Sequence, residues 1–135
     1  MKALAFHQHG GLDTLGYQDV ADPKIGEGDV LVRVRAAALN HLDLFVRDGL
    51  PGLTLPMPFW TGCDIAGEVA EVGAAVTDVR AGDRVAVNPN LSCGRCEFCR
   101  KGEHSLCVKY GILGEHIHGG LAEYVKVEGR HVVTL

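Results

Sequence analysis

The sequence predicts a mainly β fold, a small β-barrel with short helices and a separate cysteine-rich lobe. Three observations support this prediction. Short runs of alternating apolar and polar residues recur at close spacing, which is typical of small barrels. Eighteen glycines in 135 residues indicate many turns. Four of the five cysteines fall in one short stretch, which predicts an excursion from the strand pattern. We therefore expect one domain over residues 1–135.

The clearest predicted strand covers residues 30–35. Val30, Val32 and Val34 alternate there with Arg33 and Arg35, so one face of the strand is expected to be buried and the other exposed. The remaining predicted strands are bounded by glycine, proline or aspartate turns. They are Lys2–Phe6, Tyr17–Val20, Ile65–Val72, Arg84–Val87, Leu121–Val127 and His131–Leu135.

A single helix is predicted over residues 40–47. Asn40 suits the N-cap, because its short polar side chain can accept a hydrogen bond from the first helical turn. Gly49 suits the C-terminal stop, because glycine readily adopts the backbone conformation that ends a helix. We expect little regular structure in the cysteine-rich lobe, residues 92–109.

Composition excludes several classes of protein. The formal net charge is -4, whereas a nucleic-acid-binding protein usually has a basic surface. The longest uncharged stretch, residues 49–63, contains three prolines, so we expect no helix there that could cross a membrane. Residues 1–7 lack the long apolar core of a secretory signal. We therefore expect a cytoplasmic protein without nucleic-acid or membrane partners.

The strongest chemical signal is the cysteine cluster, with the spacing C-x2-C-x2-C-x7-C. Four thiolates this close in sequence can surround one metal ion without a donor from elsewhere in the chain. Zinc takes four sulfur ligands in closed, tetrahedral sites that stabilise a fold and perform no chemistry. The spacing therefore predicts one structural zinc per chain, bound by Cys93, Cys96, Cys99 and Cys107.

Two other interpretations of the cluster are weaker. Two disulfides would require an oxidising compartment, and the fifth cysteine, Cys63, makes the count odd. An iron–sulfur cluster is closer, because the first three cysteines match the bacterial ferredoxin spacing. In that motif the fourth ligand follows after three residues and precedes proline. Here the fourth cysteine follows after seven residues and precedes Val108.

Further motifs accompany the cysteine lobe along the chain: Ala36–Asp43, Gly62–Val69, Val72–Gly73, Gly82–Val85 and Gly119–Tyr124. Together they resemble the N-terminal, GroES-like catalytic domain of medium-chain dehydrogenases/reductases, which include the zinc-type alcohol dehydrogenases and the quinone-oxidoreductase-like enzymes. The resemblance covers essentially the whole chain. It implies a GroES-like β-barrel, a structural zinc on the four cysteines, and a role in NAD(P)-dependent oxidation or reduction of a small-molecule substrate.

The resemblance also identifies a missing part. Members of that family continue into a Rossmann domain that binds NAD(P), and then return to complete the catalytic domain. This sequence has no G-x-G-x-x-G motif followed by a helix, and its glycine pairs at 10–11 and 119–120 are predicted to form turns. We therefore expect a fragment, a truncated form or a degraded relative, with no cofactor-binding residues and no dehydrogenase activity alone. An apolar surface left uncovered would favour self-association.

The catalytic cleft of the family departs from its usual pattern here. Asn40 stands where a zinc-binding cysteine is expected, Cys63 where a histidine is expected, and Asp64 where a glutamate follows it. Asp43 matches the family aspartate beside the zinc, and His41 lies between them. The resemblance therefore implies a candidate catalytic cleft formed by these five residues.

Three interpretations of this cleft stay open. In the first interpretation the cleft carries no metal, as in zinc-independent relatives that reduce a carbonyl or a double bond. Alternatively, Cys63 and Asp64 bind a metal in a rearranged site with His41 or His116. In the third interpretation Cys63 is a buried, inert thiol. His41 can also relay protons, because the pKa of histidine lies near neutrality.

Two classes of function follow. The first is the catalytic part of an oxidoreductase that acts on alcohols, aldehydes, quinones or enones. The second is a non-enzymatic, zinc-stabilised interaction module. The zinc content per chain distinguishes a structural site alone from a structural site plus a rearranged cleft site.

Overall fold

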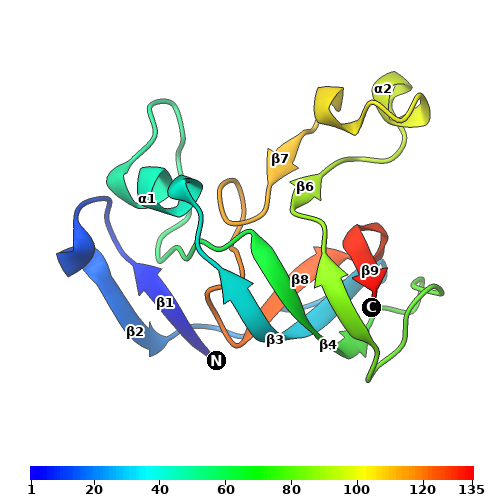
Figure 1. The fold of residues 1–135 in the computed structure, drawn as a ribbon, viewed down its shortest axis with the longest axis horizontal. Coiled ribbons are helices and arrows are strands. Elements are labelled where there is room, and N and C mark those ends of the chain that lie inside the picture. Colours follow the sequence, from blue (N-terminus) through cyan, green and yellow to red (C-terminus); the bar gives the residue numbers. More distant parts are fainter.

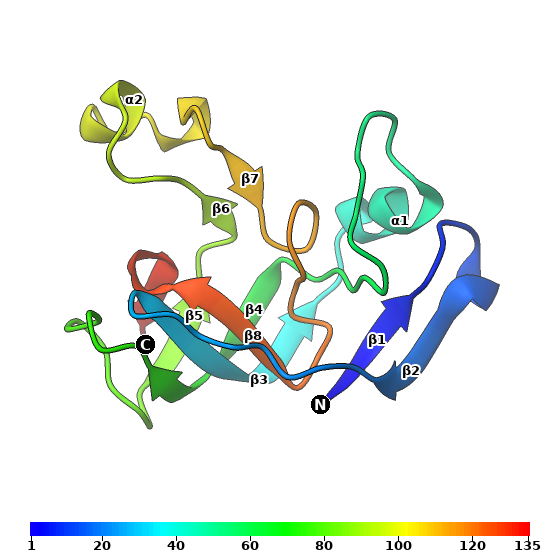
Figure 2. The same ribbon diagram turned by 180° about the vertical axis from the view of Figure 1, so that it is seen from behind.

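A computed structural model describes all 135 residues of the chain. Figures 1 and 2 show a strongly curved sheet, a hairpin at one side of it and a lobe that extends beyond the opposite end. The strands are β1 (Lys2–Phe6), β2 (Leu15–Asp19), β3 (Asp29–Ala38), β4 (Asp64–Val72), β5 (Arg84–Val87), β6 (Asn90–Leu91), β7 (Gly111–Ile112), β8 (Tyr124–Glu128) and β9 (Val132–Thr134). The helices are α1 (His41–Asp48) and α2 (Glu97–Arg100), with 3-10 turns η1 (Leu12–Thr14), η2 (His104–Leu106) and η3 (Gly129–His131).

The central sheet has the strand order β8-β3-β4-β5-β9, and all of its pairs are antiparallel. It curls into a half-barrel around the largest apolar core (Figure 1). Val30 and Val32 are fully buried in that core, whereas Arg33 and Arg35 are exposed, so the alternation predicted for this strand is confirmed. The mainly β, barrel-like fold class is confirmed with it.

A second core fixes α1 beside the hairpin formed by β1 and β2. Phe6 of β1 and Val46 of α1 are buried together with Leu55 and Phe59. Phe6 and Phe59 exchange two backbone hydrogen bonds of 2.9 Å. The N–H of Leu4 donates to the carbonyl before β8 at Leu121, 2.8 Å away. These contacts hold the hairpin, α1 and the loop after α1 as one unit against the half-barrel.

Several predicted elements coincide with the structure. β1 and β5 have the predicted bounds, and α1 follows an N-cap at Asn40 and ends at Gly49, whose φ is 103°. That positive φ favours glycine, because a Cβ would crowd the backbone. Neither helix has the length or the apolar character needed to cross a membrane.

Other predicted elements need correction. The strand predicted at Tyr17–Val20 covers Leu15–Asp19, and that predicted at Leu121–Val127 begins only at Tyr124. The preceding Gly120 and Leu121 amides donate instead to the carbonyls of Gly62 and Thr61, so this segment pairs with a loop. The strand predicted at His131–Leu135 begins at Val132, because His131 belongs to the η3 turn.

The cysteine lobe is more regular than predicted. It contains α2 and η2, and it is joined to the half-barrel through a two-stranded ribbon of β6 and β7, which the sequence did not reveal (Figure 1). Each of these strands has only two residues, so no alternation is visible in the sequence.

Candidate metal centre and catalytic cleft

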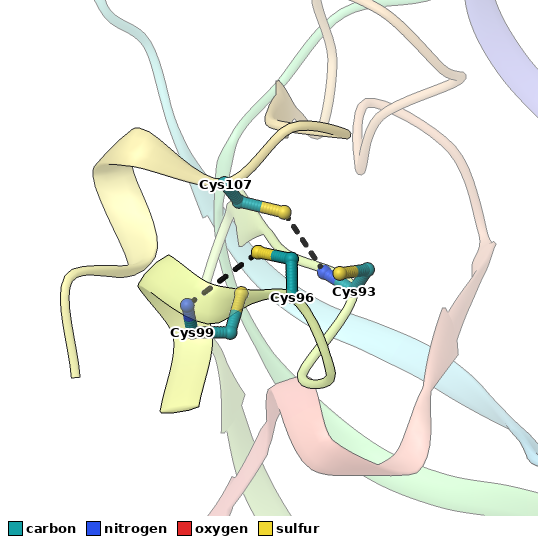
Figure 3. A group of neighbouring side chains, drawn as sticks. All are labelled: Cys93, Cys96, Cys99 and Cys107. Atoms are coloured by element: carbon teal, nitrogen blue, oxygen red, sulfur yellow. Dashed lines mark hydrogen bonds between the residues drawn. The ribbon is translucent and has the colours of Figure 1, made fainter. Parts of the chain in front are cut away.

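The fold brings the four cysteines of the lobe together. Their sulfur atoms all lie within 4.8 Å of one another and point toward a common centre (Figure 3). Cys96 is the N-cap of α2, Cys99 lies within α2, and Cys107 directly follows η2. Helix α2 and the η2 turn therefore position three of the ligands, Cys96, Cys99 and Cys107. Cys93 lies in the extended segment after β6.

Backbone N–H groups in the lobe are directed at sulfur. The N–H of Cys93 donates to Cys107 Sγ at 3.2 Å, and the N–H of Lys109 donates to the same sulfur at 3.3 Å. The N–H of Cys99 donates to Cys96 Sγ at 3.5 Å (Figure 3). Such donors stabilise thiolates, because a hydrogen bond to the charged form favours it.

Backbone N–H groups lower the pKa of two of the four thiols. Backbone N–H groups of Cys99 and Val108 lower the pKa of Cys96 to about 6. N–H groups of Arg95 and Cys96 also lower the pKa of Cys93. Burial raises the pKa of Cys99 to about 11, so its thiolate requires a bound cation. Two of the four thiols are therefore shifted toward the thiolate form that binds a metal, and Cys99 is shifted away from it.

The donor set fits zinc. A tetrahedral zinc with four sulfurs at about 2.3 Å places those sulfurs about 3.8 Å apart, which is compatible with four sulfurs that all lie within 4.8 Å of one another. All five cysteines of the chain are free thiols, so none of the four is withheld in a disulfide. His104, the one histidine within the lobe, is exposed and adds no fifth donor.

The predicted cleft residues meet between the start of α1 and the start of β4. The side-chain amide of Asn40 donates from Nδ2 to Cys63 Sγ at 3.4 Å and to Asp64 Oδ2 at 2.9 Å. Cys63 is buried, whereas Asn40 and Asp64 are exposed. Three of the five predicted residues are therefore connected by one amide group at the surface.

Asp43 holds the two segments of the cleft together. Its carboxylate is buried and accepts from the N–H of Asn40 at 2.7 Å and from the N–H of Gly62 at 2.8 Å. The first bond closes the N-terminal turn of α1, and the second ties that turn to the loop before β4. Asp43 thereby sets the distance between Asn40 and Cys63.

Cys63 is a weak acid in this setting. Burial is the main cause that raises the pKa of its thiol, and the carboxylates of Asp64 and Asp43 raise it further. A neutral thiol is a poor nucleophile, because nucleophilic attack needs the thiolate.

Neither histidine proposed for a rearranged metal site has a ligand atom gathered with those of Cys63 and Asp64. His41 is exposed at the first position of α1, with its ring centroid 6.4 Å from that of Phe45. His116 accepts a hydrogen bond at Nδ1 from the N–H of Ile112, 3.1 Å away. The four lobe cysteines are the one set of three or more cysteine, histidine or acidic side chains with ligand atoms gathered for a metal.

A hollow lined by none of the five cleft residues lies elsewhere on the chain. It has a volume of about 1210 Å³ and runs between the cysteine lobe and the half-barrel. His118 lines it and stacks on Trp60, with ring centroids 3.8 Å apart. His131 also lines it and is buried. Neither Trp60 nor His131 belongs to a motif with metal-ligand spacing, so the sequence predicts no role for them.

Comparison with known proteins places this geometry in a family. Residues 26–135 match the alcohol dehydrogenase GroES-like domain. An alcohol dehydrogenase of Schizosaccharomyces pombe is 34% identical over 134 residues, and an NAD-dependent alcohol dehydrogenase of Sulfolobus acidocaldarius is 37% identical over 132 residues. These alignments cover 98% and 94% of this chain, but 38% of each relative.

Solved structures agree. A crystal structure of an NAD-dependent alcohol dehydrogenase superposes with a TM-score of 0.95 at 46% identity, covering 99% of this chain and 39% of that one. A cobalt- and zinc-bound thermostable alcohol dehydrogenase from Pyrobaculum aerophilum gives a TM-score of 0.92 at 39% identity, covering 99% of this chain and 40% of that one.

A β half-barrel that carries a four-cysteine lobe is the N-terminal, catalytic type of domain of the zinc-type medium-chain dehydrogenases. The chain belongs to the alcohol dehydrogenase GroES-like domain family. The resemblance derived from the sequence is thereby confirmed. The chain spans about two fifths of the length of the relatives that it matches.

Proposed function

We propose that this chain is the catalytic-domain part of an NAD(P)-dependent oxidoreductase, that it binds one structural zinc in its lobe, and that its cleft works without a catalytic zinc. The match of residues 26–135 to the alcohol dehydrogenase GroES-like domain supports the first part most directly. The relatives are named as alcohol, threonine and polyol dehydrogenases, so a small molecule with a hydroxyl or carbonyl group is the proposed substrate. Reduced zinc thiolates suit the cytoplasm.

The cleft supports the zinc-free proposal through its donors. Asparagine is a weak zinc ligand, and the ligand atoms gathered for a metal are those of the lobe cysteines and not of the cleft. The Asn40 amide instead offers an N–H that can move from Cys63, its longer contact, to a substrate oxygen. A fixed donor of this kind stabilises negative charge that develops on oxygen. NAD(P), bound by the rest of an enzyme, would supply or accept the hydride.

His41 is the proposed proton carrier of the cleft. It is exposed at the first position of α1, next to Asn40 in the sequence, and an imidazole can both accept and donate a proton. Asp43 is buried and accepts from two backbone N–H groups, so its proposed role is to position Asn40. Asp64 is the acceptor that keeps the Asn40 amide turned toward the cleft.

A chimera tests the proposed activity. This chain replaces the matching N-terminal segment of the NAD-dependent alcohol dehydrogenase that it resembles at 46% identity. We expect NAD(P)-dependent turnover of an alcohol, aldehyde, quinone or enone with one zinc per chain, and about a hundredfold loss in kcat for Asn40→Ala. The isolated chain is expected to show no turnover.

The competing outcomes of this test are distinct. A folded chimera that binds cofactor but never turns over would favour a non-enzymatic, zinc-stabilised interaction module. Activity that requires a second zinc would contradict the zinc-free cleft. Turnover by the isolated chain would contradict the expectation that it is inactive alone.

We also propose that the isolated chain self-associates. Large apolar side chains are exposed on several elements: Leu39 at 73%, Phe45 at 54%, Val108 at 69% and Val133 at 54%. Exposed apolar area of this kind favours association in water. Sedimentation over a wide concentration range tests this proposal, and a clean monomer at high concentration would count against it.

A further inference from the structure

A buried histidine of the half-barrel reaches the entrance of the cysteine lobe. His131 lies at the end of η3 and is only 4% exposed. Its Nε2 accepts a hydrogen bond from the N–H of Ser92 at 3.5 Å, across 39 positions of the sequence. Ser92 immediately precedes Cys93, the first of the four clustered cysteines. The half-barrel therefore contacts the backbone that delivers the first metal ligand.

This contact continues directly into the cluster. The next N–H along the chain, that of Cys93, donates to Cys107 Sγ at 3.2 Å. Two consecutive backbone amides are thus hydrogen-bonded, that of Ser92 to His131 of the half-barrel and that of Cys93 to the sulfur of Cys107. The carbonyl of His131 also accepts from the N–H of Asn88 at 2.8 Å, so η3 holds the chain on both sides of β6. Loss of the His131 acceptor would free the backbone that orients Cys93 and its N–H···S bond.

The charges around His131 favour the required form of its ring. Burial is the main cause that lowers the pKa of His131, and the neighbouring guanidinium of Arg130 lowers it further, with a smaller contribution from His104. Arg130 pairs with Glu128 and also lies against Gly94, the residue after Cys93. At neutral pH the ring is therefore neutral, and an unprotonated Nε2 can accept from Ser92.

We propose that His131 is a positioning residue for the zinc centre, which orders the segment 92–93 from the half-barrel so that the four sulfurs are gathered before the metal binds. The inference rests on the proposed structural zinc. The geometry of the lobe would then depend on a residue outside it, because His131 lies 24 residues beyond Cys107. When a side chain that orients the ligands of a metal is removed, the affinity of the protein for that metal commonly falls.

Zinc release from the whole chain tests the proposal. Each variant is loaded with one zinc, and transfer of zinc to an excess of a coloured chelator is followed. His131→Ala and His131→Phe both remove the acceptor, and phenylalanine keeps the buried ring volume. His131→Gln places a side-chain oxygen near the position of Nε2. His104→Ala, an exposed histidine inside the lobe, is the matched control.

We expect about tenfold faster release from the alanine and phenylalanine variants. The glutamine variant and the His104 control should release zinc within about twofold of the wild-type rate, because neither lacks the acceptor. After cobalt substitution, the absorption bands of the tetrahedral cobalt–thiolate centre should broaden in the phenylalanine variant and stay unchanged in the glutamine variant.

Three results would overturn the inference. Release from His131→Phe at the wild-type rate would show that the acceptor is dispensable. Equally fast release from the glutamine and phenylalanine variants would show that the ring, and not its hydrogen bond, matters. A wild-type chain that takes up no zinc would instead overturn the zinc proposal itself, and this inference with it.

Discussion

The cysteine lobe and the cleft both contain sulfur that accepts hydrogen bonds, yet the groups around that sulfur differ. In the lobe, four sulfurs converge and three N–H···S bonds are shared unequally among them. In the cleft, Cys63 and Asp64 both accept from Asn40, and Asp43 accepts from two backbone amides. The four lobe sulfurs all lie within 4.8 Å of one another, whereas the cleft gathers no such set of ligand atoms. The lobe is therefore organised around a metal, whereas the cleft is organised around an amide.

The largest expected effect is the response of the lobe to loss of its metal. Chelation of the zinc, or Cys107→Ser, should remove hydrogen-exchange protection throughout residues 92–109, because structural zinc contributes directly to folding. The amides of β3 and β4 should stay protected, since their core has no cysteine lobe residue. Hydrogen exchange with mass spectrometry measures both regions in one sample.

Equal loss of protection in the sheet would contradict this separation of lobe and half-barrel. Cys63→Ser is the matched control, because it changes a cysteine of the cleft and should leave the lobe protected. A metal-free lobe that keeps its protection would show that the thiols alone maintain it.

The next effect concerns the carboxylate that closes the cleft. Asp43→Ala leaves the N–H groups of Asn40 and Gly62 without their acceptor and should lower the free energy of unfolding by about 3 kcal/mol. Asp48→Ala, at an exposed aspartate of the same helix, should cost less than about 0.5 kcal/mol. Urea unfolding of both variants provides the comparison, and equal costs would exclude a clamping role for Asp43.

The smallest effect is the pH response of Cys63. Its pKa is raised in the folded chain, so the thiol binds its proton more tightly there than in the unfolded chain. The resulting stabilisation is fully present below the unfolded thiol pKa, about 8.5, and is lost as pH rises through the folded pKa. Alkylation of Cys63 in the zinc-loaded chain at pH 8 should be at least about tenfold slower than in urea.

Asp64→Asn sharpens this test. It removes one of the two carboxylates that raise the Cys63 pKa and keeps an oxygen for the Asn40 amide. Alkylation should then accelerate by about threefold, since the larger cause, burial, remains. An unchanged rate would show that the Asp64 charge does not reach the thiol.

Much of the half-barrel was predictable because its strands are half-buried. The valine and arginine alternation of β3 and the apolar run of β5 carry their pattern in consecutive residues. The ribbon of β6 and β7 was not predictable, since two-residue strands separated by the whole lobe leave no periodicity. The strand predicted at His131–Leu135 includes His131, which instead ends the η3 turn and accepts at its carbonyl from the N–H of Asn88.

The two candidate sites differ in the same way. The four cysteines carry their geometry in their spacing, so the cluster followed from the sequence directly. The meeting of Asn40 with Cys63 depends on the pairing of β3 with β4, and it was reached through the family resemblance. The contact of His131 with Ser92 lies outside any motif, and only the folded chain reveals it.

The most direct test of the central claim is the zinc content of the purified chain and its cysteine variants after saturation with zinc, measured by native mass spectrometry. We predict one zinc for the wild-type chain, one for Cys63→Ser and none for Cys107→Ser. This pattern would assign the metal to the lobe and leave the cleft without one. Two zinc ions in the wild-type chain, with one lost on Cys63→Ser, would contradict the account and restore a metal to the cleft.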